Sequence, residues 1–186
     1  MILDMHPHWR YVIEGTLGRI SKVVASAWTA IPERFDEDGD RYQVDVEDST
    51  SVLVELENGV HGSIFGSWAT RVRLDEPLYI HVDGTSGSAV AGLHRCHIQP
   101  LAQTPDVAWS PNVDPAKDHR EDWAEVTDLW SYPNSYRVGW EAFIRHVLTD
   151  APLTSDLSAG IRDVMLAEAC YSSARENRWV SLREFE

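Results

Sequence analysis

Hydrophobic residues near the start of the chain recur at helical spacing. Trp9, Val12 and Ile13 follow one another at intervals that fit a helix, after Pro7, a residue that suits the first helical turn. Gly15 is a residue type that ends helices. The pattern therefore predicts a helix from Pro7 to about Gly15.

The middle of the chain has the periodicity of β-strands. Residues 20–31 are rich in β-branched side chains and apolar on both alternating faces, which is typical of a strand covered on both sides. Two strand-like runs then flank Asn58-Gly59, a dipeptide that favours the type I′ turn of a hairpin. Further strands are expected at 77–82, 88–92, 96–99 and 179–182, with a Gly-rich turn at 84–87. The pattern predicts five or more antiparallel strands.

Helical periodicity returns at the end of the chain. Residues 101–136 contain several prolines and tryptophans, which favours a long loop packed on the surface. The apolar residues of 137–150 fall on one helix face, and Ser155 or Asp156 can cap a second helix that runs to about Arg175. This order of elements indicates an α+β fold: a large, mostly antiparallel open β-sheet with helices on one face.

Composition and charge exclude several classes of function. The 186 residues include 16 Lys and Arg against 30 Asp and Glu, which gives a net charge of −14. Such a charge repels nucleic-acid phosphates and anionic membrane surfaces, and no apolar run approaches the ~18 residues that span a bilayer. The start of the chain lacks the basic and apolar regions of a signal peptide. We expect a single domain over residues 1–186, in the cytoplasm, with no nucleic-acid or membrane partner.

Two polar segments resemble binding loops, but each lacks a required feature. Asp36, Asp38, Asp40 and Glu47 match positions of a calcium-binding loop, yet Arg41 replaces the glycine that the sharp turn requires. The segment DGTSGSAVAG resembles a phosphate loop, but small, strand-forming residues follow it instead of a helix. An exposed loop and a hairpin turn are the better interpretations. No G-x-S-x-G elbow or reactive cysteine context supports an independent nucleophile.

The segment before the first predicted helix holds the strongest candidates for chemistry. Asp4 and His8 are four residues apart, with His6 between them. An aspartate that accepts a hydrogen bond from one imidazole nitrogen fixes the tautomer and leaves the other nitrogen free as a general base. Two histidines and an aspartate could also bind a divalent metal. Alternatively, Asp4 caps the helix and His8 only packs, and the spacing alone leaves all three interpretations open.

A series of motifs in this chain resembles a known protein family. The motifs are, in order, Asp4-x-x-x-His8, Val46-Glu47-Asp48, Asn58-Gly59, Ser67-Trp68, Asp83-Gly84-Thr85-x-Gly87-Ser88, Glu168-Ala169 and Ser172-Ser173-Ala174. Together they resemble the C-terminal domain of the Gfo/Idh/MocA family, which includes glucose–fructose oxidoreductase and inositol dehydrogenase. The resemblance covers nearly the whole chain.

The resemblance implies half of a two-domain NAD(P)-dependent dehydrogenase. In that family an N-terminal Rossmann domain holds the dinucleotide and a catalytic lysine. A C-terminal domain, similar to those of dihydrodipicolinate reductase and glyceraldehyde-3-phosphate dehydrogenase, supplies substrate contacts and the oligomer interface. Asp4 and His8 match the family's Asp and His, with His8 as the acid/base or hydroxyl-binding group and Asp4 as its partner. The candidate substrate contacts are His6, Arg10, Tyr11, Trp68 and Arg71.

The sequence also departs from the family. It has no G-x-G-x-x-G after a strand, no Glu-Lys-Pro and only the lysines Lys22 and Lys117, so the Rossmann half is missing. Tyr11 stands where many polyol-specific members have an acidic residue, which leaves the substrate class open. We therefore expect a fragment or truncated gene product that binds no cofactor or metal and is inactive alone. It would bind a small-molecule substrate and form a homodimer or larger oligomer through its sheet. The alternative is a stand-alone, non-enzymatic module that binds a sugar-like ligand or another protein.

Overall fold

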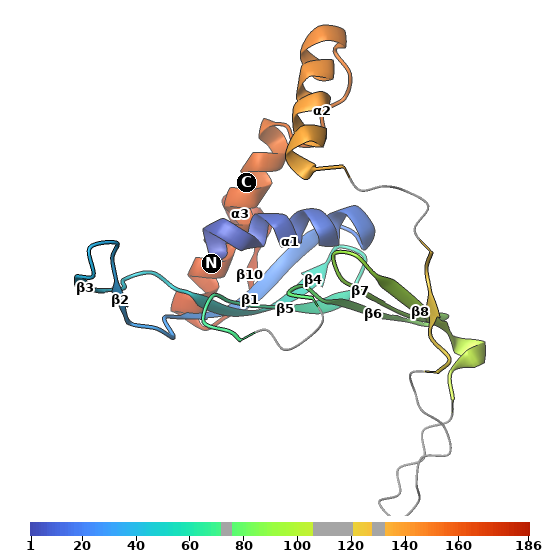
Figure 1. Cartoon of the computed structure of the whole chain (residues 1–186), viewed down its shortest axis with the longest axis horizontal. Coiled ribbons are helices and arrows are strands. Elements are labelled where there is room, and N and C mark those ends of the chain that lie inside the picture. The colour runs from blue at the N-terminus through green and yellow to red at the C-terminus, as the bar shows by residue number, and fades with distance from the viewer. Residues whose placement is uncertain (72–75, 106–120, 128–132) are drawn as a thin grey trace, which may run out of the picture. The chain divides into compact units, whose positions relative to one another are not determined.

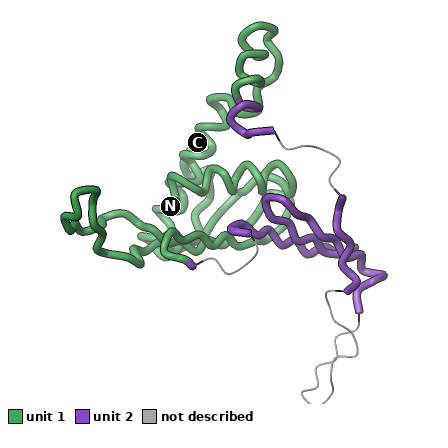
Figure 2. Tube along the Cα trace, in the orientation of Figure 1, with its two compact units in different colours: residues 1–70, 140–186 green, residues 71–139 purple. Residues whose placement is uncertain are grey.

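The computed structural model describes residues 1–71, 76–105, 121–127 and 133–186. The chain forms two compact units: residues 1–70 with 140–186, and residues 71–139 (Figure 2). Most of the loop predicted at 101–136 lies outside the described residues. The single domain predicted for residues 1–186 stays a prediction.

The first unit is built on a four-stranded antiparallel sheet. Its strands, in spatial order, are β10 (Val180–Ser181), β1 (Ile20–Trp28), β4 (Ser49–Leu56) and β5 (His61–Ser67). Alternate residues of β4 point into the core: Val52 and Val54 are buried while Leu53 is exposed. Strand β1 ends at Trp28, earlier than predicted, because Ala30 and Ile31 donate their N–H groups to the carboxylate of Asp48.

The hairpin predicted at Asn58-Gly59 is confirmed, but its turn is not of type I′. Only Gly59 has a positive φ, of 82°, and the loop contains three residues between Leu56 and Val60, whose backbones pair. Such a loop combines an ordinary turn with one left-handed residue, a position that glycine occupies at little cost. The side-chain amide of Asn58 donates to the carbonyl of Leu17 at 2.8 Å and thereby ties the hairpin to the end of the first helix.

Two helices cover one face of this sheet (Figure 1). They are α1 (Ile2–Thr16) and α3 (Leu157–Glu176). In the second half of α3, small buried residues such as Ala167, Ala169 and Ser173 allow the helix to lie close to β1. Ala25 of β1 donates its N–H to the Ser173 hydroxyl at 2.9 Å. The predicted α+β fold, with antiparallel strands and helices on one face, is confirmed.

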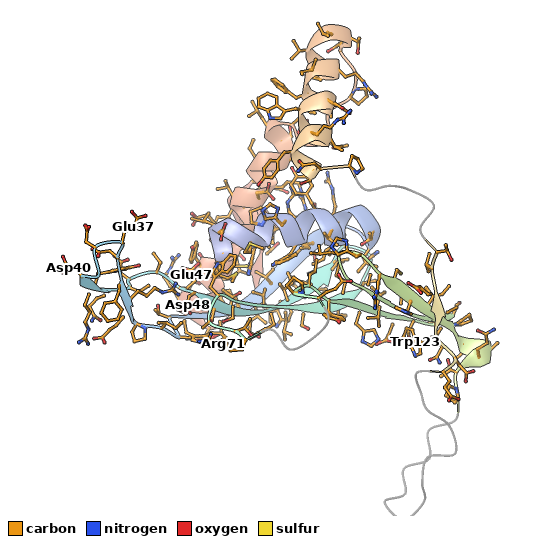
Figure 3. All side chains as sticks on the ribbon, in the orientation of Figure 1. Glu37, Asp40, Glu47, Asp48, Arg71 and Trp123 are labelled. Carbon is orange, nitrogen blue, oxygen red and sulfur yellow. The ribbon has the colours of Figure 1, made fainter. Side chains whose placement is uncertain are left out.

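The acidic stretch between β1 and β4 forms a short ribbon where an exposed loop was expected. Its strands are β2 (Glu33–Phe35) and β3 (Arg41–Gln43). At the tip, the Asp36 carboxylate accepts N–H groups from Asp38 and Asp40. Glu37 and Asp40 lie at this tip, and Glu47 and Asp48 lie at the base of the ribbon (Figure 3).

The second unit contains a separate antiparallel sheet. Its strands, in spatial order, are β6 (Ile80–Gly84), β7 (Gly87–Ala91), β8 (Cys96–Pro100) and β9 (Ala124–Glu125). The predicted turn at 84–87 joins β6 to β7. Gly87 is required there, since a Cβ atom would lie 2.4 Å from the carbonyl oxygen of Gln99.

The remaining elements are helical. They are α2 (Ser135–Thr149) and the 3₁₀ helices η1 (Leu101–Gln103) and η2 (Leu182–Phe185). Among the residues that the structure describes, no helix combines the length and the apolar character needed to cross a membrane.

Candidate functional site

Helix α1 presents two faces of different character. Ile2, His6 and Arg10 recur every four residues and are buried against the sheet and α3. Asp4 and His8 lie on the opposite, exposed face. Side chains four residues apart on a helix are neighbours, so the structure brings the predicted catalytic pair together on the surface. Within the described structure, the two side chains make no hydrogen bond to each other.

Helix α1 begins five residues earlier than its pattern predicts. Pro7 therefore lies inside the helix, and Glu47 organises the start. The Glu47 carboxylate accepts the N–H of Ile2 at 2.9 Å and the hydroxyl of Tyr171 at 3.1 Å. Burial opposes ionisation of Glu47, but these hydrogen bonds outweigh it and lower the pKa of its carboxyl. The family motif residue Glu47 thus anchors the helix that carries Asp4 and His8.

His6 has a structural environment. Its side chain is 1% exposed, and its Nε2 atom lies 3.0 Å from the hydroxyl of Thr50 on β4. Its Nδ1 atom faces the sulfur of Cys170 on α3. Burial lowers the pKa of His6 to about 4, so the imidazole is neutral at pH 7. His6 joins α1 to the sheet and to α3, and it offers almost no surface to a substrate.

Arg10 is the centre of a buried ion cluster. Its Nε atom donates to Asp163 at 2.5 Å, its Nη1 atom to Glu14 at 2.8 Å and its Nη2 atom to the carbonyl of Ala159 at 3.2 Å. Burial disfavours the charge, but the hydrogen bonds to the two carboxylates outweigh burial and raise the pKa of Arg10. Its guanidinium also lies 4.3 Å from the centre of the Tyr11 ring.

Glu14 and Arg162 complete this cluster. Arg162 of α3 donates two N–H groups to the Glu14 carboxylate, which also accepts the N–H of Ile20 at 3.1 Å. The sequence pattern did not identify Glu14, Arg162 and Asp163 as functional residues. One signal was available: Glu14 lies in the last turn of α1, where the helix dipole disfavours an acid unless a cation faces it. The cation, Arg162, is far away in the sequence.

Asp48 performs a similar role at the base of the β2–β3 ribbon. Its buried carboxylate accepts N–H groups from Ala30 at 2.7 Å and Ile31 at 3.0 Å, the hydroxyl of Ser49 at 2.9 Å and Nη2 of Arg34 at 3.2 Å. Burial alone would raise its pKa, but these four hydrogen bonds lower the pKa of Asp48 to about 2. Asp48 therefore holds Arg34 and the ribbon in place.

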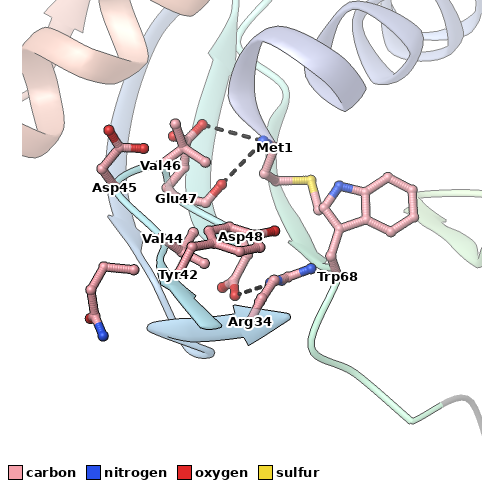
Figure 4. A pocket seen from close by; sticks show the side chains of 10 residues that line it. Met1, Arg34, Tyr42, Val44, Asp45, Val46, Glu47, Asp48 and Trp68 are labelled. Atoms are coloured by element: carbon pink, nitrogen blue, oxygen red, sulfur yellow. Dashed lines mark hydrogen bonds and ion pairs between the residues drawn. The ribbon is translucent and has the colours of Figure 1, made fainter. Parts of the chain in front are cut away.

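An open hollow of about 360 Å³ lies beside the start of α1 (Figure 4). Its lining comprises Met1, Arg34, residues 42–48 and Trp68. Met1 lines the hollow, and Met1, Asp4 and His8 follow one another at intervals of three and four residues, which places them on one side of the helix. The hollow therefore adjoins the N-terminal end of the exposed face of α1. The rise of 1.5 Å per residue places His8 about 10 Å along the helix from Met1.

The structure places the other predicted contacts in different settings. Tyr11 is exposed on α1, three residues beyond His8. Trp68 is exposed at the end of β5, and its backbone N–H donates to the backbone carbonyl of Asp48 at 2.9 Å. Arg71 is exposed in the second compact unit.

The described residues do not fit a dinucleotide. A Rossmann site needs a strand, a glycine-rich turn and a helix in succession, so that the pyrophosphate meets the helix N-terminus. Here the glycine-rich turn at 84–87 joins two antiparallel strands. Across the described ranges, no three metal-ligating side chains gather into a group that could hold an ion. The predicted absence of a cofactor and a metal remains a prediction.

The chain is similar in sequence to a sugar dehydrogenase. It is 38% identical over 188 residues to a D-xylose dehydrogenase of Paenarthrobacter nicotinovorans, a match that covers 99% of this chain and 48% of the relative. The chain thus spans about half the length of the curated relative that it matches.

Solved structures share the fold. A levoglucosan dehydrogenase in complex with NADH and L-sorbose has a TM-score of 0.76 and 19% identity, over 98% of this chain and 50% of its own. An oxidoreductase from Agrobacterium radiobacter in complex with NAD⁺, L-tartaric acid and magnesium has a TM-score of 0.70 and 16% identity, over 100% of this chain and 50% of its own. Residues 1–90 also match the family model of the GFO/IDH/MocA C-terminal domain. This match confirms the resemblance of the motifs to the C-terminal domain of the GFO/IDH/MocA family.

Proposed function

We propose that this chain is the substrate-binding and oligomerisation half of an NAD(P)-dependent oxidoreductase that acts on a sugar, a polyol or a related hydroxy compound. The observation that carries the proposal is the pair Asp4 and His8 on the exposed face of a helix whose other face is fixed by buried bonds. A general base needs such a rigid support, because proton transfer requires atoms held within hydrogen-bond distance. The sugar dehydrogenases among its relatives support the substrate class.

In this proposal His8 exchanges a proton with a substrate hydroxyl. One imidazole nitrogen faces the substrate, and the other donates a hydrogen bond to Asp4, which fixes the tautomer. The nicotinamide, which accepts or supplies the hydride, would be held by residues outside this chain. The chain alone would therefore be inactive.

Trp68, Tyr11 and Arg71 remain proposed substrate contacts. The exposed indole of Trp68 lines the hollow and offers a flat apolar surface for the C–H face of a sugar. His6 and Arg10 are different, since both side chains are buried and bonded inside the fold. We assign them the positioning of α1, because their burial does not support direct substrate contact.

A homodimer through the sheet is part of the same proposal. The face of the sheet opposite the helices exposes Trp28, Leu53 and Phe65, and the rings of Trp28 and Phe65 lie 6.5 Å apart. An apolar face of this kind suits a two-fold contact with a second copy. We also propose a cytoplasmic location.

A fusion protein tests the activity. The part of the Paenarthrobacter D-xylose dehydrogenase that this chain does not match is joined to Met1, and reduction of NAD⁺ and NADP⁺ is followed with aldoses and polyols. We expect reduction by the fusion, none by the chain alone, and a loss of about a hundredfold or more in kcat after His8→Ala. His61→Ala, which removes an exposed histidine from β5, is the matched control and should retain activity. Undiminished kcat in the His8→Ala fusion would refute the role of His8.

A further inference from the structure

The hollow beside the start of α1 combines features that suit a sugar ring. Two exposed aromatic side chains, Tyr42 of β3 and Trp68 at the end of β5, belong to its lining (Figure 4). Each aromatic group offers a flat apolar face and a polar edge, which match the C–H faces and the hydroxyl rim of a sugar. The volume of about 360 Å³ lies at the lower end of the range for small-molecule pockets, so the hollow suits a single ring-sized group.

Arg34 of β2 adds hydrogen-bond donors to the wall of the hollow. Its Nη2 atom donates to the Asp48 carboxylate at 3.2 Å, and 37% of its side chain is exposed. Its buried Nε atom has no hydrogen-bond partner among the residues that the structure describes. A guanidinium carries five N–H donors in a planar fork, and a buried donor without a partner is unfavourable. Arg34 can therefore donate to ligand oxygens, and two neighbouring hydroxyls of a sugar fit the fork.

The charges of the lining favour a neutral ligand. Asp48 pairs with Arg34, and Glu47 pairs with the terminal ammonium group of Met1. Asp45 adds a third carboxylate, so carboxylates outnumber cations in the lining. An excess of negative charge repels a sugar acid or a sugar phosphate, whereas an uncharged sugar is unaffected by it.

The hollow is separate from the proposed catalytic pair. Its lining includes Met1 but none of Ile2–Thr16, the residues of α1. His8 lies about 10 Å farther along the helix than Met1. A general base must lie within hydrogen-bond distance of the hydroxyl from which it takes a proton. Because a single sugar ring is shorter than this separation, the ring that reacts at His8 does not fill the hollow.

We infer that the hollow is a second subsite, which binds the non-reacting unit of a neutral disaccharide or glycoside while the reacting unit lies at Asp4 and His8. The inference rests on the proposed function. Tyr42 and Trp68 pack against the non-reacting unit, and Arg34 donates to its hydroxyls. Contacts to a remote part of a substrate hold the reacting part in position, which accelerates the reaction beyond what the smaller substrate achieves.

Isothermal titration calorimetry of the chain tests the subsite. The probes are D-xylose and D-glucose and the disaccharides xylobiose, cellobiose and maltose, which contain only these two sugars. We expect at least one disaccharide to bind about tenfold more tightly than the monosaccharide that it contains. Cellobiouronic acid, which differs from cellobiose by one carboxylate, should bind more weakly than cellobiose.

Substitutions in the ribbon assign the binding to the hollow. Tyr42→Ala should abolish the advantage of the disaccharide. Phe35→Ala is the matched control, because Phe35 is an exposed aromatic residue of the same ribbon outside the lining. Arg34→Lys should reduce the advantage through the loss of the planar fork. Arg41→Lys, at an exposed arginine of the ribbon that pairs with Glu33, should leave it intact.

Several outcomes would overturn the inference. They are the absence of any disaccharide advantage, an equal loss of the advantage in Tyr42→Ala and Phe35→Ala, and tighter binding of cellobiouronic acid than of cellobiose.

The fusion described above separates this inference from the proposed activity. In the fusion, Tyr42→Ala should raise KM for the disaccharide about tenfold and leave KM for the monosaccharide unchanged. A disaccharide advantage in binding without reduction of either nucleotide would refute the proposed activity alone. Reduction with monosaccharides and no disaccharide advantage in KM would refute the subsite alone.

Discussion

The two faces of α1 carry histidines in opposite environments. His6 is buried, bonded to Thr50 and held neutral, while His8, two residues later, is exposed on the opposite face beside Asp4. Because two residues turn a helix by about 200°, the same residue type meets the core at one position and solvent at the next. One face holds the helix in the fold, and the other leaves Asp4 and His8 exposed for the chemistry that we propose.

Arg10→Ala, on the buried face of α1, should have the largest effect on stability. The substitution leaves the carboxylates of Glu14 and Asp163 without their shared partner, and breaking a buried ion pair in this way costs about 3–5 kcal/mol of unfolding free energy. Urea denaturation measures the loss. Arg19→Ala, at an exposed arginine between α1 and β1, is the control and should cost less than about 0.5 kcal/mol. Equal costs for the two variants would show that the buried ion cluster around Arg10 does not hold α1.

His6 and His8 should differ next in their effect on acid stability. Burial depresses the pKa of His6 to about 4 in the folded state, against an ordinary value of 6.5. The unfolded chain therefore binds the extra proton between these values, and stability falls as the pH drops from about 6.5 to 4, by about 3 kcal/mol. Above pH 6.5 this stability is fully present, because His6 is neutral in both the folded and the unfolded chain.

Substitution separates the two histidines in the same measurement. His6→Phe should remove this part of the pH dependence of unfolding, because no titrating group remains at the position. His8→Phe should leave it in place. A slope between pH 6.5 and 4 that survives His6→Phe and disappears with His8→Phe would reverse the assignment of the two faces.

Much of this fold follows from local patterns. The strand alternation, the hairpin at Asn58-Gly59 and the closing helices are visible because each depends on neighbouring residues. The start of α1 does not follow from a local pattern, because it is fixed by Glu47 and Tyr171, which are distant in the sequence. Since the predicted helix began at Pro7, His6 fell outside it, and the buried stripe that His6 shares with Ile2 and Arg10 was hidden.

The same limit applies to the candidate site. The spacing of Asp4 and His8 was enough to predict a pair beside the start of a helix. The structure extends the helix to Ile2 and so places both residues on one exposed face of α1. The roles of Arg10 and Glu14 depend on Arg162 and Asp163, which the fold brings together across most of the chain. A charged residue on an otherwise apolar stripe signals a hidden partner, but it does not identify that partner.

Asp48 and Asp4 extend the comparison to two carboxylates, with a smaller expected effect. Four hydrogen bonds lower the pKa of Asp48 to about 2 from an ordinary value of 3.8. The contribution of Asp48 to the free energy of unfolding is therefore present above about pH 4 and is lost as the pH falls toward 2. The contribution amounts to about 2 kcal/mol. Asp48→Asn should remove it and flatten the acid-unfolding curve in that range, whereas Asp4→Asn, at an exposed carboxylate without described hydrogen bonds, should not. If both variants alter acid unfolding equally, Asp4 is also part of the structural support, and both faces of α1 hold the helix in the fold.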